Sequence, residues 1–151
     1  MKNILFLTLF ISLAFFTACD SEEFEVRQDS LENVKADASG EWTLFSITRN
    51  KTDISEHFDT SGMKLTLSGA NFTLSSSSLP FPTLKTTGTA FSTGNWAFDD
   101  DYQPSVIHFK GGSETVPVNL TYPLYGKNNN SLGLEFSLGC GASTYQYQFK
   151  K

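Results

Sequence analysis

The sequence predicts an all-β domain, an antiparallel up-and-down meander of about eight strands that follows an export signal and a tether. From residue 40 onward, short segments alternate apolar and polar residues with a period of two, as strands with one buried face do. Turn-forming Gly and Asn separate these segments, and only residues 53–58 favour a short helical turn. Such a meander avoids exposed edges by closing into a β-barrel, although a β-sandwich is the alternative fold.

The predicted strands are, in chain order, residues 41–49, 63–68, 71–76, 87–92, 95–99, 105–110, 115–122, 132–138 and 144–149. The count falls to eight if the segment 95–99 continues 87–92. In the first strand, Trp42 and Leu44 lie on one face while Phe45 and Ile47 lie on the other, so we expect both faces to be covered. Alternation is clearest in the sets expected to face the core, namely Met63, Leu65 and Leu67; Val116, Val118, Leu120 and Tyr122; Leu132, Leu134, Phe136 and Leu138; and Tyr145, Tyr147 and Phe149.

Residues 1–18 have the order of a signal peptide, with one cation at Lys2, an apolar stretch over 4–16 and small residues before Cys19. A transmembrane helix is the alternative, but it needs about 20 apolar residues, and acidic residues follow this stretch at once. The sequence Phe-Thr-Ala-Cys at 16–19 resembles the lipobox of bacterial lipoproteins, departing from the usual leucine at Phe16. The resemblance implies cleavage before Cys19 and lipidation of its sulfur with palmitate-type acyl chains. A secreted protein with an incidental cysteine is the alternative.

Residues 19–39 are polar and lack strand alternation, which predicts a flexible tether between the lipidated cysteine and a domain over 40–151. Ser30 lies in an Asp-Ser-Leu triplet that resembles the O-glycosylation sequon of Bacteroidota. An acidic run at the start of the tether resembles the lipoprotein export signal of the same phylum, which implies an outer-membrane protein facing the cell exterior; an ordinary acidic spacer is the alternative. The run consists of Ser21, Glu22, Glu23, Phe24 and Glu25.

Four motifs in the domain carry a further resemblance, to the lipocalin-like domains of Bacteroidota lipoproteins. They are Gly-Glu-Trp-Thr-Leu at 40–44, Gly-Asn-Trp-Ala-Phe at 94–98, Ser-Val-Ile-His-Phe at 105–109 and Leu-Gly-Leu-Glu-Phe at 132–136. The resemblance covers most of 40–151 and implies a lipocalin-type barrel whose Gly-x-Trp motif packs an indole over one end. It also implies a lipophilic ligand and no catalytic residue.

The residues offer little catalytic or metal-binding chemistry. A net charge of −5 disfavours nucleic acid as a partner. His57, His108 and Cys140 are the only soft metal donors after Cys19, too few for a zinc site, and no Gly-x-Ser-x-Gly turn marks a nucleophile. Residues 99–101 are three aspartates that suit either a solvated turn or Ca²⁺. We therefore expect no enzyme, no metal and no cofactor.

The candidate ligand contacts are Leu79, Phe81 and Leu84, in a proline-stiffened connection, together with Trp96. Apolar loops at barrel mouths often contact ligands, although this loop could simply fold back over the barrel end. We expect a non-enzymatic binding module for a small apolar ligand or glycan, held at the membrane by its lipid. The alternative is a structural or interaction subunit of an outer-membrane assembly, docking through exposed aromatic side chains.

Lipidation of Cys19 can be tested directly. We expect the wild-type protein to incorporate a palmitate analogue in cells and to fractionate with membranes, because several acyl chains hold a protein to a bilayer almost permanently. Cys19→Ser should lose the label and leave the membrane fraction. An unlabelled wild type, or an unchanged distribution of the variant, would contradict the prediction.

Overall fold

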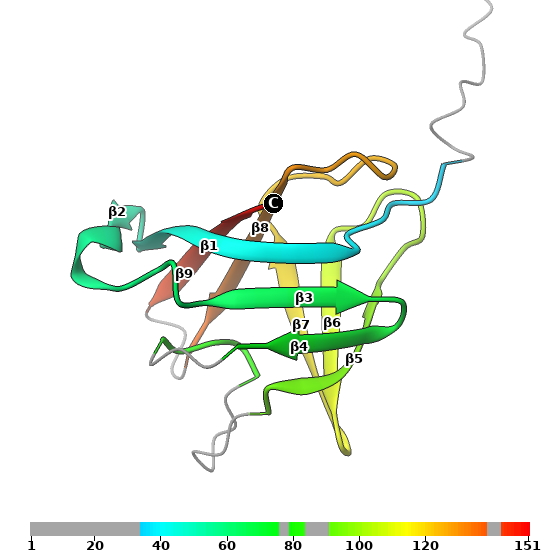
Figure 1. Ribbon diagram of the computed structural model, residues 1–151, viewed down its shortest axis with the longest axis horizontal. Coiled ribbons are helices and arrows are strands. Elements are labelled where there is room, and N and C mark those ends of the chain that lie inside the picture. The colour runs from blue at the N-terminus through cyan, green and yellow to red at the C-terminus, as the bar shows by residue number, and fades with distance from the viewer. Residues whose placement is uncertain (1–33, 76–78, 84–90, 139–142) are drawn as a thin grey trace, which may run out of the picture.

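The computed structural model describes residues 34–75, 79–83, 91–138 and 143–151 (Figure 1). Its single sheet runs in the order β2-β1-β3-β4-β5-β6-β7-β8-β9, and β1 also pairs with β9. The eight strands other than β2 therefore close into an antiparallel up-and-down barrel, the architecture of lipocalin-like folds, which confirms the predicted fold class. The strands are β1 Gly40–Arg49, β2 Thr52–Asp53, β3 Lys64–Ser68, β4 Asn71–Leu74, β5 Thr93–Phe98, β6 Val106–Gly111, β7 Glu114–Leu120, β8 Ser131–Ser137 and β9 Thr144–Lys150.

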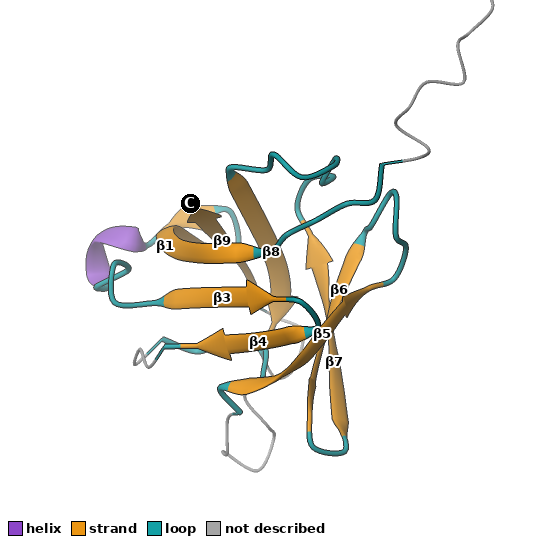
Figure 2. Cartoon of the chain, turned by 45° about the vertical axis from the view of Figure 1, so that its right-hand side comes forward, coloured by secondary structure: helices purple, strands orange, loops and turns teal. Residues whose placement is uncertain are grey.

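Most strand boundaries agree with the predicted ones to within two residues. The predicted strand 87–92 lies almost entirely outside the described residues, and the barrel takes β5 from the Gly-Asn-Trp segment instead. The expected helical turn is a single 3₁₀ turn, η1 (Ser55–His57), and the two-residue strand β2 was not predicted. Figure 2 shows how β1, β3 and β4 form one wall of the barrel while β6 to β9 form the other.

Strand β1 is bulged, which corrects the expectation that both of its faces are covered. The pairing of β1 with β9 shifts register between Leu44 and Ser46. The extra residue at the bulge shifts the alternation of inward and outward side chains by one position. Trp42, Leu44 and Ile47 therefore all face the core, while Phe45 is 44% exposed. On the outer surface, the Lys150 ammonium lies 5.6 Å from the centre of the Phe45 ring.

One end of the barrel is covered by residues 34–39, which we call the strap. The amide of Ala36 donates to the carbonyl of Asp101 at 2.8 Å, and that of Asp37 donates to the carbonyl of Gly126 at 2.9 Å. These bonds dock the last part of the predicted tether on the turns β5–β6 and β7–β8 (Figure 1). Beneath the strap, the buried Trp42 indole donates to the carbonyl of Ala38 at 2.7 Å, as the Gly-x-Trp motif implied.

Close strand packing at Gly94 can be tested by adding one methyl group. A Cβ atom there would lie 2.0 Å from the carbonyl oxygen of Lys110 and 3.0 Å from the Phe72 ring. We expect Gly94→Ala to lower the free energy of unfolding by about 2 kcal/mol or more, because backbone atoms must move apart. Gly62→Ala is the control, since its Cβ would meet only the Asp59 carboxylate at 3.5 Å. Equal urea midpoints for the two variants would contradict the prediction.

Candidate functional site

The end of the barrel opposite the strap is filled by residues 79–83, which we call the plug. Two of the predicted ligand contacts, Leu79 and Phe81, are buried there, and Phe81 is only 3% exposed. The Phe81 ring lies edge-on to Phe109, with ring centres 5.5 Å apart, and 6.2 Å from Phe136. The plug is thus part of the core, and not an exposed loop at the barrel mouth.

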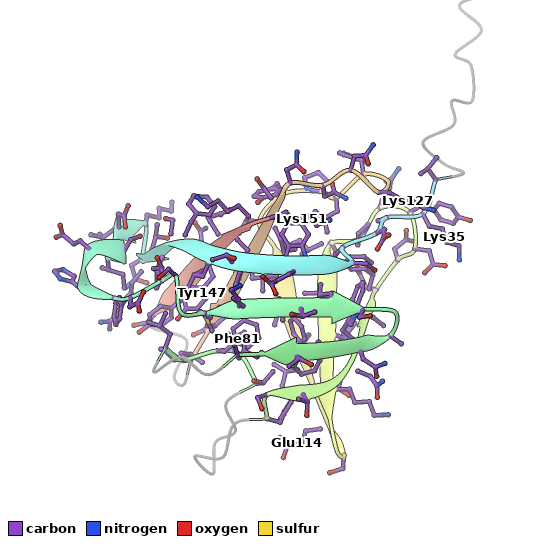
Figure 3. All side chains as sticks on the ribbon, viewed as in Figure 1. Lys35, Phe81, Glu114, Lys127, Tyr147 and Lys151 are labelled. Carbon is purple, nitrogen blue, oxygen red and sulfur yellow. The ribbon has the colours of Figure 1, made fainter. Side chains whose placement is uncertain are left out.

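A hydrogen bond holds the plug in place. The hydroxyl of Tyr147, on β9, donates to the carbonyl of Pro80 at 2.6 Å, and burial raises the pKa of this tyrosine (Figure 3). The prolines at 80 and 82 restrict the backbone, so the segment loses less conformational entropy when it docks. Leu84, the third predicted contact in this connection, lies outside the described residues.

Trp96 lies on the inner face of β5. Antiparallel partners point to the same side of a sheet, and Trp96 pairs with the fully buried Phe109. Its ring meets that of Phe98 edge-on, with centres 5.1 Å apart. Phe109 therefore contacts the plug through Phe81 and neighbours Trp96 across the sheet, so the predicted contacts Phe81 and Trp96 share one neighbour.

Several inward-facing apolar residues of β5 and β7 are only partly buried. Phe98 pairs with Ile107, Val116 pairs with Phe109, and Leu120 pairs with Leu134, and the partner in each pair is fully buried. Phe98, Val116, Leu120 and Trp96 are nevertheless only partly buried. We call this partly accessible set the inner apolar face; it consists of Trp96, Phe98, Val116 and Leu120.

Among the described residues, two buried side-chain polar atoms have no hydrogen-bond partner, namely Trp96 Nε1 and Thr83 Oγ1. Thr83 is 0% exposed and belongs to the plug, whereas Trp96 belongs to the inner apolar face. An unmet buried donor or acceptor costs about 1–3 kcal/mol. The interior thus presents two hydrogen-bonding atoms without partners beside aromatic and aliphatic side chains.

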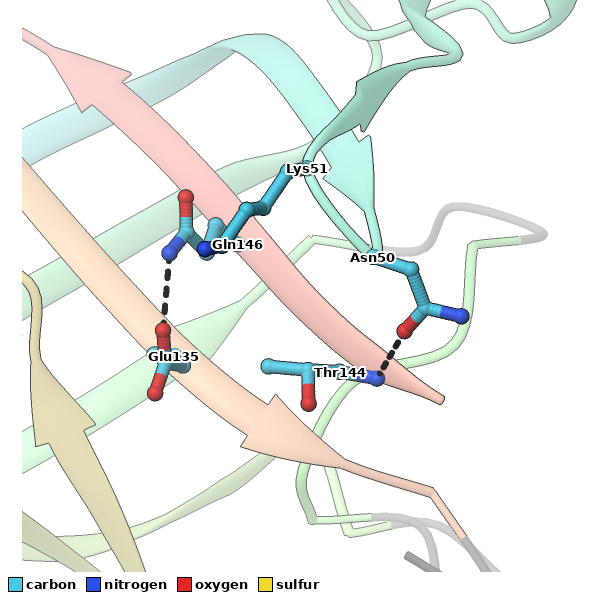
Figure 4. Close-up of a pocket in the computed structure, with 5 residues that line it drawn as sticks. All are labelled: Asn50, Lys51, Glu135, Thr144 and Gln146. Carbon is cyan, nitrogen blue, oxygen red and sulfur yellow. Dashed lines mark hydrogen bonds between the residues drawn. The ribbon is translucent and has the colours of Figure 1, made fainter. Parts of the chain in front are cut away.

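A separate pocket of about 380 Å³ lies on the outer wall, at the plug end of the barrel (Figure 4). The Gln146 amide donates to the Glu135 carboxylate at 2.7 Å, and the Thr144 amide donates to Asn50 Oδ1 at 2.9 Å. Nothing in the sequence singled out this pocket, because its residues come from β8, β9 and the turn after β1. Its lining residues are Asn50, Lys51, Glu135, Thr144 and Gln146.

The acidic cluster serves the turn between β5 and β6. The Asp99 carboxylate accepts bonds from the hydroxyl of Ser105 at 2.7 Å and from the amides of Ser105 and Val106, both at 2.9 Å. Asp100 accepts from the amides of Tyr102 and Gln103, both at 2.7 Å. Within the described ranges, no three His, Cys, Asp or Glu side chains gather to hold a metal ion. Asp99 and Asp100 therefore stabilise this turn through hydrogen bonds, in agreement with the solvated turn that the sequence also suggested.

Of the other residues named from the sequence, some lie in the described ranges and some lie outside them. His57 is exposed on η1 and His108 is half-buried on the outer face of β6. Across the part of the chain that the structure describes, no helix is long and apolar enough to span a membrane. Cys19, Ser30, Cys140 and the acidic run at 21–25 lie outside the described residues.

Comparisons with protein-family models, with curated proteins and with solved structures gave no match to this chain. Its function must therefore be argued from the geometry of the inner apolar face, the plug and the outer pocket.

The bonds to Asp99 predict a pH-dependent contribution to stability. The Ser105 hydroxyl, followed by the amides of Val106 and Ser105, lowers the pKa of Asp99 to about 2. A carboxyl with a lowered pKa stabilises the fold fully above its unfolded pKa of about 4, and loses this contribution as pH falls toward 2. Because Asp99 is exposed, we expect Asp99→Ala to cost about 1 kcal/mol at pH 7.

The deficit of Asp99→Ala should shrink between pH 4 and pH 2, as measured by urea unfolding at each pH. Glu56→Ala, at an exposed carboxylate whose neighbour is His57 at 3.7 Å, is the control and should be neutral. A deficit that stays constant down to pH 2 would argue against the carboxylate as its source.

Proposed function

We propose that this protein is a non-enzymatic binding module that holds a small, largely apolar molecule against the inner apolar face of its barrel. The observation that supports this most is that inward-facing apolar side chains remain partly accessible to solvent around Trp96, in a barrel of lipocalin-like architecture. Small-molecule sites are typically apolar with a few polar groups that fix orientation. The inner apolar face together with Trp96 Nε1 and Thr83 Oγ1 has this composition.

The two unpartnered atoms indicate which polar groups the molecule carries. An indole N–H can only donate, whereas a threonine hydroxyl can donate or accept. A ligand with an apolar body and a carbonyl, ether or hydroxyl oxygen would satisfy the indole, and a second such group would satisfy the threonine. A pure hydrocarbon would leave both atoms unmet and would therefore bind less tightly.

The proposed location is the outer membrane, facing the cell exterior, with the domain anchored through lipid on Cys19. The leader, the lipobox resemblance and the acidic run at 21–25 support this proposal. The strap also fits it, because residues 34–39 bring the chain onto the barrel at the end opposite the plug.

A second candidate function is that of an interaction subunit, docking through the strap end of the barrel. Three of the exposed large apolar side chains belong to the strap and its neighbouring turns: Val34, Tyr102 and Tyr125. Val34 lies beside Gly126, and the Lys35 ammonium lies 6.0 Å from the Tyr102 ring. Chemical crosslinking in intact host cells tests this function, and recovery of no stoichiometric partner would count against it.

Native mass spectrometry of the protein purified from its host tests the ligand proposal. We expect a bound small molecule, and we expect Trp96→Leu to lose it while remaining folded, because the substitution removes the indole donor and keeps an apolar side chain. Phe45→Leu, at an aromatic residue on the outer face, is the control and should retain the molecule. Wild-type protein that is free of ligand would contradict the proposal.

Thr83→Val separates the effect of the plug hydroxyl on stability from its proposed effect on binding. Replacing an unmet buried hydroxyl by a methyl group should raise the free energy of unfolding of ligand-free protein by about 1 kcal/mol. The same change should weaken binding of the host molecule. Thr73→Val, at an exposed position on β4, is the control for both measurements. A destabilised Thr83→Val variant would show that the hydroxyl has a partner in solution.

A further inference from the structure

The turn between β1 and β2 contains a residue that its backbone conformation disfavours. Arg49 pairs with Thr52, so Asn50 and Lys51 form a two-residue hairpin turn, and both have positive φ, 49° and 69°. Such turns strongly prefer Asn followed by Gly. Asn tolerates the left-handed region, whereas a lysine there is strained. The chain thus keeps a lysine where glycine would be more stable.

The strained turn is fixed against the barrel wall. The Asn50 amide donates to the carbonyl of Thr144 at 2.8 Å, and Asn50 Oδ1 accepts from the Thr144 amide at 2.9 Å. These two bonds set the position of the next residue. Lys51 extends over β9 toward Gln146, and its ammonium has no hydrogen-bond or ion-pair partner among the described residues (Figure 4).

The pocket beneath Lys51 offers hydrogen-bonding groups of several kinds. Gln146 pairs with Glu135 across β8 and β9, which places a carboxylate and an amide side by side, and the Thr144 hydroxyl lies on the same outer face. The nearby Arg49 guanidinium is already engaged, since it donates to the Ser143 hydroxyl at 2.9 Å and lies 5.9 Å from the Tyr145 ring. Among the described residues around the pocket, Lys51 is therefore the cation available to a ligand.

We infer that the outer pocket binds an acidic sugar unit, with its carboxylate on Lys51 and its hydroxyls on Thr144, Gln146 and Glu135. The Lys51 ammonium suits one carboxylate, while hydroxyls that both donate and accept suit an adjacent amide and carboxylate. The volume of about 380 Å³ lies in the range of small-molecule sites, and the pocket is open to solvent on one side. One unit of a longer glycan could thus occupy it while the chain continues outside.

This site is separate from the inner apolar face. Gln146 and Glu135 lie on the outer surface of the barrel, while their neighbours Tyr147, Leu134 and Phe136 point inward. The inference therefore does not rest on the proposed interior ligand, and the two can fail independently.

The test is an NMR titration of the full domain with digalacturonate, with the neutral disaccharide digalactose as its counterpart. We expect saturable amide shifts at Lys51, Glu135, Thr144 and Gln146, and at least tenfold weaker binding of the neutral sugar. Lys51→Ala should weaken digalacturonate binding at least tenfold, while Lys51→Arg keeps it. Lys127→Ala, at an exposed lysine of the opposite end, should bind as wild type does.

Lys51→Gly tests whether the lysine is kept for binding in spite of its strained backbone conformation. We expect this variant to lose binding as Lys51→Ala does, yet to raise Tm by about 4 °C because glycine relieves the positive φ. Equal affinity for both disaccharides, no saturable shifts, unchanged affinity of Lys51→Ala, or a Tm of Lys51→Gly at or below wild type would each overturn the inference. Thr83→Val should leave digalacturonate binding unchanged, which distinguishes this site from the interior one.

Discussion

The pairing of β1 with β9 is the constraint on which the rest of the structure depends. It turns a meander into a closed barrel, so that each of the eight barrel strands pairs with a neighbour on both of its sides. Closure also requires a bulge in β1 that shifts its alternation of inward and outward side chains. With this shift, Trp42 packs at the strap end and Ile47 faces the core opposite Tyr147. Without that bulge, Ser46 would enter the core and Ile47 would face water.

Closure leaves an interior that is filled unevenly. Around Phe109, the plug and the aromatic residues Phe72 and Phe81 pack edge to face and exclude solvent. Around Trp96 the same inward face of the sheet is less completely covered, and it contains one of the two buried side-chain polar atoms that lack a hydrogen-bond partner in the described part of the chain. The barrel thus combines a closely packed aromatic core with neighbouring inward-facing residues that are only partly buried, and recognition of a small molecule needs both rigidity and unmet contacts.

Sequence patterns predicted what depends on local periodicity. Strands such as β3, with Leu65 and Leu67 alternating against polar neighbours, were found with nearly correct bounds, and the Gly-x-Trp motif correctly implied an indole over one barrel end. The bulge at Phe45 was missed because an added residue leaves a sequence pattern that also fits a strand buried on both faces. The plug agrees with the alternative that the loop folds back over the barrel end, although its contact between Phe81 and Phe136 could not be read from the sequence. The outer pocket was not predictable, since Asn50 meets Thr144 only through the closed topology.

The strap has a mechanical consequence. A pull on the chain from upstream of residue 34 does not act first on β1, because the amides of Ala36 and Asp37 and the side chain of Lys35 are bonded to the turns at 101 and 126. These attachments must open before tension reaches the sheet, so the barrel is loaded only after the strap has left the two turns.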